Sequence, residues 1–221
     1  MWRIRCLDKL VDELASGKSF EMIIGNREAD AADNKEQNKE YVFSAAIHEN
    51  LERGGDQLDA MKIRTATLKD LDSVTAVEAT CFPAAEAATR EEFRDRLSHY
   101  GNHFWLLFNG DKLVAFVDGF VTDEPDLTDE MYAKAEMHNE NGAWQMIFGV
   151  NTIPEYRRNG YASQLIERAI ADAREQDRKG LVLTCKDKLV HYYAGFGFQD
   201  EGVSEKSVHG GTVWHQMRLT F

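Results

Sequence analysis

The chain has 221 residues, of which 43% are hydrophobic and 29% are charged, as is ordinary for a folded globular protein. Its formal net charge of −12 argues against a general nucleic-acid binder and suits a cationic partner. No apolar run approaches the roughly 18 residues of a membrane span, and the first residues lack the apolar core of a secretory signal. The sequence therefore predicts a protein that binds neither nucleic acid nor membrane.

The cysteines and histidines give no sign of a disulfide framework or a metal centre. Cys6, Cys81 and Cys185 are odd in number and far apart, which favours a reducing cytoplasm as the location. The histidines form no cluster with ligand spacing, so the sequence predicts no metal.

Residues 1–60 predict a helical N-terminal extension. Apolar residues recur at helical spacing over residues 4–14 and 40–53, and glycines at Gly17 and Gly54 end the two segments. We find no catalytic pattern in this extension. It is interpreted as a helical cap on the main domain, and the alternative is a dimerisation or partner element that would make the protein a homodimer.

A larger domain of α/β class is predicted over residues 61–221. Two capping boxes, Thr67 to Asp70 and Thr89 to Glu92, start helices, and Asn109-Gly110 is a strong hairpin signal. The predicted elements are, in chain order, strand 63–66, helix 67–79, helix 89–100, strands 103–108 and 113–121, helix 128–138, strand 144–152, helix 157–179, strand 181–185, helix 189–195, and strands 198–203 and 212–219. The strand–helix–strand rule makes the strands on either side of the long helix parallel. We therefore expect a mixed sheet with helices on both faces.

The stretch over residues 144–163 carries the main chemical signal. Its first half is apolar and β-prone, and Pro154 ends it because proline cannot donate to a ladder. Its second half opens a helix, whose first backbone N–H groups lack partners within the helix and lie at the positive end of the helix dipole. Gly160 lets an anion approach the main chain, and Arg157 and Arg158 suit phosphate oxygens. The stretch predicts an anion site, although it is neither a Walker loop nor a Gly-x-Gly-x-x-Gly turn.

These features resemble those of a known family. Arg157-x-x-Gly160-x-Ala162 after a strand looks like the acyl-CoA pyrophosphate loop of the GNAT superfamily of N-acyltransferases. Further stretches, in matching order, resemble the serotonin (arylalkylamine) N-acetyltransferase branch of that superfamily and its bacterial relatives. They are Cys81-Phe82-Pro83, Asp111 to Phe116, Leu127-Thr128, Cys185 to Val190 and Tyr193 to Phe198. The resemblance covers residues 61–221 and leaves residues 1–60 outside.

The resemblance implies a GNAT fold, in which two parallel strands splay apart at a bulge and acetyl-CoA lies in the gap as co-substrate. Val150, Asn151 and Thr152 match the family's pantetheine strand, whose backbone pairs with the cofactor as an added strand would. The family's pyrophosphate contacts match Arg158, Asn159, Gly160, Tyr161, Ala162 and Ser163, and Arg157 is expected to bind the cofactor with them. Tyr193 matches the tyrosine that protonates the departing thiolate, and the alternative for it is an aromatic core residue.

One departure from the branch concerns the proton route of the acceptor. The branch carries two histidines on the central strand where this chain has Met146 and Phe148, which cannot carry protons. We expect these two residues and Phe82 to line an apolar throat for the acceptor. The general base is open, and the candidates, acting through water, are Glu124, His138 and Gln145. Glu124 and Gln145 are also expected on the substrate side.

Carboxylates gather between Asp123 and Glu140, against the single lysine Lys134, just before the cofactor strand. Negative charge there would attract protonated amines to the acceptor mouth, and the alternative is a solvated acidic surface.

We therefore expect an acetyl-CoA-dependent N-acetyltransferase in which a primary amine of a small cationic molecule attacks the thioester directly. A protein or peptide amine is the alternative acceptor. The alternative from another class is a non-catalytic acyl-CoA-binding sensor module, which the missing histidines suggest and Tyr193 opposes.

Overall fold

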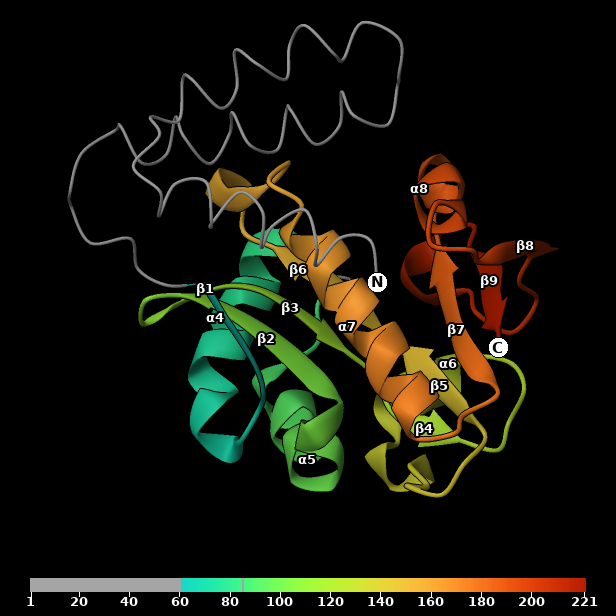
Figure 1. Cartoon of the computed structure of the whole chain (residues 1–221), viewed down its shortest axis with the longest axis horizontal. Helices are drawn as coiled ribbons and strands as arrows, with labels where there is room; N and C mark the ends of the chain where they lie inside the picture. The colour runs from blue at the N-terminus through green and yellow to red at the C-terminus, as the bar shows by residue number, and fades with distance from the viewer. Residues whose placement is uncertain (1–60, 85) are drawn as a thin grey trace, which may run out of the picture. The chain divides into compact units, whose positions relative to one another are not determined.

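A mixed central sheet forms the frame of the domain in the computed structural model, which describes residues 61–84 and 86–221 (Figure 1). The helices predicted for residues 1–60 lie outside the described residues. The first part of the sheet is antiparallel throughout, in the order β1-β2-β3-β6. Its strands are β1 (Met61–Thr65), β2 (Phe104–Asn109), β3 (Lys112–Asp118) and β6 (Gly149–Thr152). The hairpin predicted at Asn109-Gly110 joins β2 to β3 and is confirmed.

The second part of the sheet contains the parallel pair that the sequence predicts. Its strands run in the order β4-β5-β7-β9-β8. They are β4 (Val121–Thr122), β5 (Trp144–Ile147), β7 (Gly180–Cys185), β8 (Gln199–Val203) and β9 (His215–Thr220). β5 and β7 are parallel, whereas the other neighbours are antiparallel. The predicted α/β class and mixed sheet are confirmed.

The strand predicted over residues 144–152 divides at Phe148 and belongs to both parts of the sheet. The Phe148 N–H donates to the backbone oxygen of Asp118 at 2.7 Å, which keeps the two parts joined across the division. β5 pairs with β7 as far as Ile147 and Leu183, and beyond that point the ladder of β6 is with β3. The two parallel strands therefore splay apart, as the resemblance implies.

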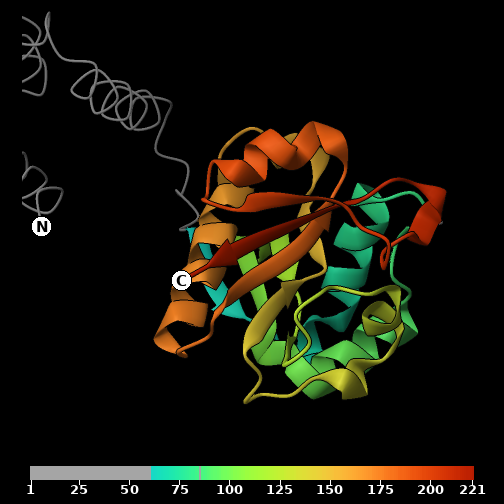
Figure 2. The same cartoon turned by 90° about the vertical axis from the view of Figure 1, so that its right-hand side faces the viewer.

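Helices cover both faces of the sheet (Figures 1 and 2). α4 (Leu71–Cys81) and α5 (Arg90–Tyr100) lie on one face, and α7 (Tyr161–Glu175) lies on the other. The capping box predicted for α5 is present, because the Glu92 N–H donates to Thr89 Oγ1 at 3.2 Å and the Thr89 N–H donates to the Glu92 carboxylate at 2.6 Å. None of the helices in the described part of the chain has the length and apolar character to cross a membrane.

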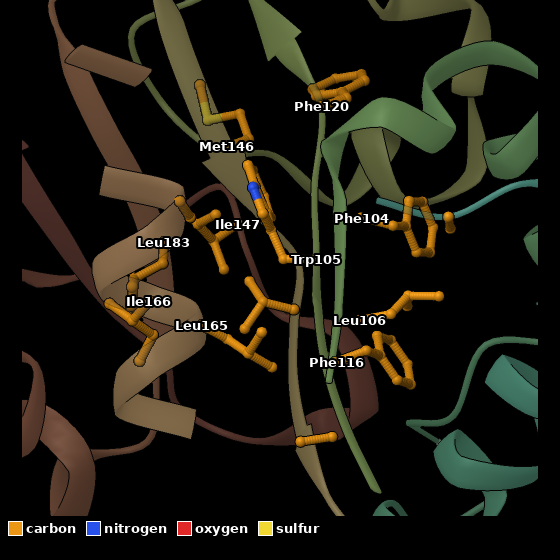
Figure 3. Packing of buried hydrophobic residues seen from close by; sticks show 14 of the residues in the cluster. Phe104, Trp105, Leu106, Phe116, Phe120, Met146, Ile147, Leu165, Ile166 and Leu183 are labelled. Carbon is orange, nitrogen blue, oxygen red and sulfur yellow. The ribbon is translucent and has the colours of Figure 1, made fainter. Parts of the chain in front are cut away.

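Alternate residues of β2 bury their side chains on opposite faces of the sheet (Figure 3). Phe104 and Leu106 lie with Phe116 on the side of α4 and α5, while Trp105 faces α7. All four side chains are at most 2% exposed. Fully burying a side chain of this kind contributes about 1.5–3 kcal/mol. The Trp105 Nε1–H also donates to Asp172 of α7 at 2.7 Å, so a hydrogen bond reinforces the packing of this helix.

The helix predicted over residues 128–138 is wrong in its length. The structure has a short helix, α6 (Asp129–Ala133), and a separate 3-10 turn, Ala135–Met137. The side chain of Arg96 donates to the backbone oxygen of Tyr132 at 2.9 Å. That oxygen is one that a continuing helix would need, so a tertiary contact ends α6 early.

The helix predicted from residue 157 begins later, at Tyr161. Arg158 and Gly160 both have left-handed backbone conformations, with φ of 66° and 78°, which the helix cannot include. Residues 157–160, between the 3-10 turn Pro154–Tyr156 and α7, form an exposed turn. The last predicted helix is shorter than expected and is α8 (Val190–Ala194).

Candidate functional site

A pocket of about 300 Å³ lies where β5 passes into β6 and β7 turns away. Phe82 and Phe148, both expected on the substrate side, line it, as do Val150 and Tyr193. Its other lining residues come from α4, α5, the loop between them, β3, α6, β5, β6, β7, the turn before α8 and the segment before β9. The structure therefore brings part of the predicted cofactor strand, the predicted acid and two acceptor residues to one place.

Glu78 of α4 is a buried carboxyl group in the wall of this pocket, only 6% exposed. Its Oε1 accepts a hydrogen bond from the Ala88 N–H at 3.1 Å, whereas its Oε2 has no partner among the described residues. Burial, followed by the nearby charge of Asp118, raises the pKa of Glu78 to about 7, although the nearby Arg96 charge and Asn151 side chain act in the opposite direction. A carboxyl group with such a pKa is partly ionised at neutral pH and is suited to accept a proton there.

Asp118, at the end of β3, is the second buried acid of the pocket. It is 1% exposed, and Arg96 contacts its Oδ2 at 3.2 Å. Burial raises the pKa of Asp118 to about 6, although the Arg96 guanidinium acts in the opposite direction. A Cβ on Gly149 would lie 2.5 Å from Asp118 Oδ1. A glycine at this position therefore leaves room for the carboxylate that a larger residue would not. Asp118 is thus compensated by a cation, and Glu78 is the less engaged of the two acids.

Tyr193 of α8 lines the pocket and is 6% exposed. Burial raises the pKa of its phenol well above the usual value, so the group keeps its proton at physiological pH. Its ring packs edge-on against Phe198, with centroids 6.1 Å apart, and against Tyr192 at 5.1 Å. The residue is therefore well fixed and carries its proton at physiological pH.

The ladder between β3 and β6 decides which backbone groups face the gap. The Ile153 N–H donates to the backbone oxygen of Val114 at 3.0 Å, and Asn151 stands opposite Phe116. Backbone groups alternate in direction along an antiparallel pair, so those of Asn151 point toward β3 and those of Val150 and Thr152 point away from it. We therefore expect Val150, rather than Asn151, to offer backbone groups to the pantetheine, since the Thr152 backbone oxygen already accepts a hydrogen bond from Arg157.

The turn before α7 has the features of an anion site. A Cβ on Gly160 would meet nothing within 4 Å, so the space in front of the helix N-terminus is open. Arg157 Nε donates to the backbone oxygen of Thr152 at 3.0 Å, and Asn159 Nδ2 donates to that of Tyr156 at 3.2 Å. These bonds hold the turn, while the exposed Arg158 side chain is available to phosphate oxygens.

Further along this turn, Tyr161, Ala162 and Ser163 are half-buried. Their backbone N–H groups belong to the first turn of α7, where a helix has no internal acceptors. The Ser163 hydroxyl lies 3.2 Å from the Tyr192 hydroxyl. The predicted pyrophosphate residues therefore lie at a helix N-terminus of the kind that binds anions.

The predicted base candidates do not line the pocket. Gln145 is 1% exposed, and its Nε2 donates to the backbone oxygens of Phe120 at 3.1 Å and Met146 at 2.8 Å. Met146 is fully buried in the core and is not a lining residue either (Figure 3). Glu124 is exposed, and His138 is engaged in a separate cluster. Of the three residues expected in the throat, Phe82 and Phe148 line the pocket and Met146 does not.

The acidic segment 123–140 is largely engaged in pairs of its own. Asp126 contacts Lys206 at 2.8 Å and Arg218 at 2.9 Å. Among the carboxylates of this segment, Asp129 lines the pocket. The other carboxylates of the lining come from elsewhere and are Glu78, Glu86, Glu92 and Asp118. The negative character of the pocket is thus supplied mainly by α4, α5 and β3.

Sequence reasoning missed Glu78, although a signal for it exists. Leu71, Val74 and Val77 form the buried stripe of α4, and Glu78 continues that stripe four residues after Val74. A carboxylate on the apolar stripe of an amphipathic helix is buried when the helix packs, and buried charges are rare without a function or a partner. Arg96 gives the same signal on the stripe of α5.

His103, His138 and Glu140 form a second cluster, in which one possible ligand atom of each lies within 4.8 Å of the others. His138 Nδ1 accepts the Val121 N–H at 3.2 Å, which assigns the proton of the neutral ring to Nε2, facing Glu140 at 3.3 Å. Arg178 also contacts Glu140, at 3.2 Å. A protonated Nε2 cannot ligate a metal ion, and the Arg178 guanidinium repels one. The arrangement is therefore explained by hydrogen bonds and charge pairing.

Known proteins resemble this chain in sequence and in fold. The model of the acetyltransferase (GNAT) family matches residues 71–198. The serotonin N-acetyltransferase of Mesocricetus auratus is 29% identical over 150 residues, which are 66% of this chain and 70% of that protein.

Two solved structures share the fold. The loading GNATL domain of CurA from Lyngbya majuscula is 17% identical with a TM-score of 0.63, over 73% of this chain and 98% of that one. The ribosomal-protein-S18-alanine N-acetyltransferase from Escherichia coli is 16% identical with a TM-score of 0.54, over 73% and 94%. The family match spans more than half of the chain and includes the splayed strands, the turn before α7 and Tyr193. The chain belongs to the GNAT family of acetyltransferases, which use an acyl-CoA co-substrate.

Proposed function

We propose that the protein transfers the acetyl group of acetyl-CoA to a primary amine on a small cationic molecule. The observation that carries this proposal is Glu78, a buried carboxyl group whose Oε2 is unpartnered within residues 61–84 and 86–221 and whose pKa is raised to about 7. It stands in a pocket at the splay of the sheet, together with Tyr193. Such a pair offers a base for the amine and an acid for the leaving thiolate.

Each residue has a defined part in the proposed reaction. Bound acetyl-CoA supplies the thioester. Glu78 attracts the protonated amine and accepts its proton, so that the neutral amine can attack. The Val150 N–H, directed away from β3, is placed to donate to the carbonyl oxygen as negative charge develops on it. Tyr193 holds a proton for the departing sulfur.

The dimensions and lining of the pocket favour a small acceptor. A pocket of about 300 Å³ is at the lower end of the range for small-molecule sites and does not suit an extended peptide. Phe82, Phe148 and Tyr132 supply apolar surface, while carboxylates supply the negative charge. We therefore favour a primary amine on an apolar or aromatic stem over a peptide amine.

The test is release of the coenzyme A thiol from acetyl-CoA over a panel of amines. The panel contains aliphatic and aromatic primary amines, polar amines, and peptides with free N-termini or lysines. Thiol release with small apolar amines is the expected result. Binding of acetyl-CoA by calorimetry without turnover of any amine would support the sensor module instead, and turnover confined to peptides would support the peptide alternative.

A negative charge introduced into the turn before α7 tests the placement of the cofactor. Gly160→Glu should weaken acetyl-CoA affinity by at least about tenfold, because the carboxylate repels the pyrophosphate at the helix N-terminus. The left-handed φ of 78° also predicts a stability loss on the order of 1 kcal/mol. Calorimetric titration measures the affinity, and thermal melting measures the stability.

Gly202→Glu is the matched control for that variant. Gly202 also has a left-handed φ, of 93°, and an added Cβ there would meet nothing within 4 Å. The control therefore carries the same strain and the same charge at β8, away from the turn. Equal acetyl-CoA affinity in Gly160→Glu and Gly202→Glu would contradict the assignment of the turn.

A further inference from the structure

Two residues that line the pocket hold an ammonium group of the protein itself, that of Lys186, which is not a lining residue. Lys186 Nζ lies 2.9 Å from each carboxylate oxygen of Glu86. The same ammonium lies over the ring of Trp214, 5.4 Å from its centroid. Both Glu86 and Trp214 line the pocket. A carboxylate beside an aromatic face is the chemistry that recognises an organic cation, and here a lysine satisfies it.

The carboxylates of Glu78 and Glu86, which both line the pocket, differ in whether a cation already engages them. Glu78 belongs to the wall with an unpartnered oxygen in the described part of the chain. Glu86 is only 13% exposed in its side chain, and its two oxygens are engaged by Lys186. Glu78 can therefore take an ammonium group, while the Lys186 charge at Glu86 opposes the binding of a second one there.

We propose that Lys186, held by Glu86 over Trp214, is a specificity-determining residue that restricts the acceptor to amines with one ammonium group and excludes α,ω-diamines. This inference rests on the proposed function. The lysine occupies the carboxylate that would otherwise attract a distal ammonium group, and it adds a positive charge beside that carboxylate. Discrimination comes from this built-in repulsion, because the apolar stem of a diamine and of a monoamine can make the same contacts.

Replacing Lys186 by methionine tests the proposal directly. Methionine keeps an unbranched stem of similar bulk and leaves the Glu86 carboxylate free beside Trp214. The readout is the ratio of kcat/KM for an α,ω-diamine to that for the n-alkylamine of equal length, over stems of three to eight carbons. We expect this ratio to rise by at least about tenfold at the best-fitting stem length, since close charge pairs in such environments are worth that factor or more.

The partner residue should act in the opposite direction. Glu86→Gln removes the carboxylate and leaves the Lys186 charge uncompensated, so the ratio should fall below that of the wild type. The double variant Glu86→Gln/Lys186→Met removes both charges and should lose the diamine preference gained by Lys186→Met. Opposite shifts from the two single variants are not expected from a pair that only stabilises the fold.

Lys188→Met is the matched control, because it makes the same chemical change at an exposed lysine two residues along. Its ratio should equal that of the wild type. An unchanged ratio in Lys186→Met, with monoamine turnover retained, overturns the proposal. If Lys186→Met loses monoamine turnover, the Glu86→Gln variant decides the question. A diamine-to-monoamine ratio in Glu86→Gln that does not fall below that of the wild type then overturns the proposal. Absence of thiol release with every amine in the wild type is a different result, because it rejects the proposed function itself.

Discussion

Replacing Glu78 by glutamine should lower kcat/KM for the amine by a factor on the order of 10²–10⁴, the usual loss when a general base is removed. Acetyl-CoA affinity should stay unchanged, because Glu78 belongs to the acceptor pocket and not to the turn before α7. In the wild type, kcat/KM should rise with pH through about 7, since Glu78 must be ionised to accept a proton and its pKa is about 7. In Glu78→Gln, that rise should be absent.

Loss of folding cannot account for the expected effect of Glu78→Gln. Burial raises the pKa of Glu78 in the folded protein, so the ionised form is the costly one, and the cost grows as pH rises through about 7. A neutral glutamine avoids this cost, so the variant should melt at an equal or higher temperature than the wild type above that pH. Glu91→Gln, at an exposed carboxylate of α5 outside this pocket, should leave kcat/KM unchanged. Turnover of Glu78→Gln within about tenfold of the wild type at every pH would mean that the amine proton leaves by another route.

Replacing Tyr193 by phenylalanine should lower kcat by a factor on the order of 10²–10⁴, because it removes the proton donor for the leaving thiolate. The change deletes one oxygen and keeps the ring that packs against Phe198, so folding and acetyl-CoA affinity should be retained. Steady-state rates of thiol release, together with calorimetric affinity, measure the effect.

Tyr192→Phe removes the same atom one residue earlier in α8 and is the control for Tyr193→Phe. The Tyr192 hydroxyl contacts Ser163 in the first turn of α7, so its loss should act on the KM for acetyl-CoA rather than on kcat. A fall in kcat of less than about tenfold in Tyr193→Phe, with acetyl-CoA still bound, would show that solvent or another group protonates the thiolate.

The elements that the sequence predicts well are those whose signals are local. The capping boxes at Thr67 and Thr89 and the Asn109-Gly110 hairpin each involve residues within a few positions of one another, and all three are present. The break of the central strand at Phe148 has no such signal. It arises because β5 pairs with β7 and β6 with β3, two partners that are distant in sequence.

The candidate site is only partly visible in the sequence, for a related reason. The resemblance to the family indicates the turn before α7 and Tyr193, but it offers no base in place of the missing histidines. Polar residues near the central strand, such as Gln145 and His138, are candidates by sequence, but their hydrogen bonds are made to groups outside the pocket. Glu78 lies some 70 positions before the strand, and the packing of α4 against the sheet brings it to the pocket.

The division of the central strand at Phe148 also bears on how such a protein can change during evolution. The gap between β6 and β7 is made by main chain, and its existence depends on which strands pair rather than on most side chains. Gly149 is an exception, since any larger residue would collide with Asp118. The acceptor pocket is instead walled by side chains from several separate elements. Substitutions in those walls can alter the choice of amine while the donor half of the reaction is inherited unchanged, so relatives with the same gap can diverge in the molecules that they acetylate.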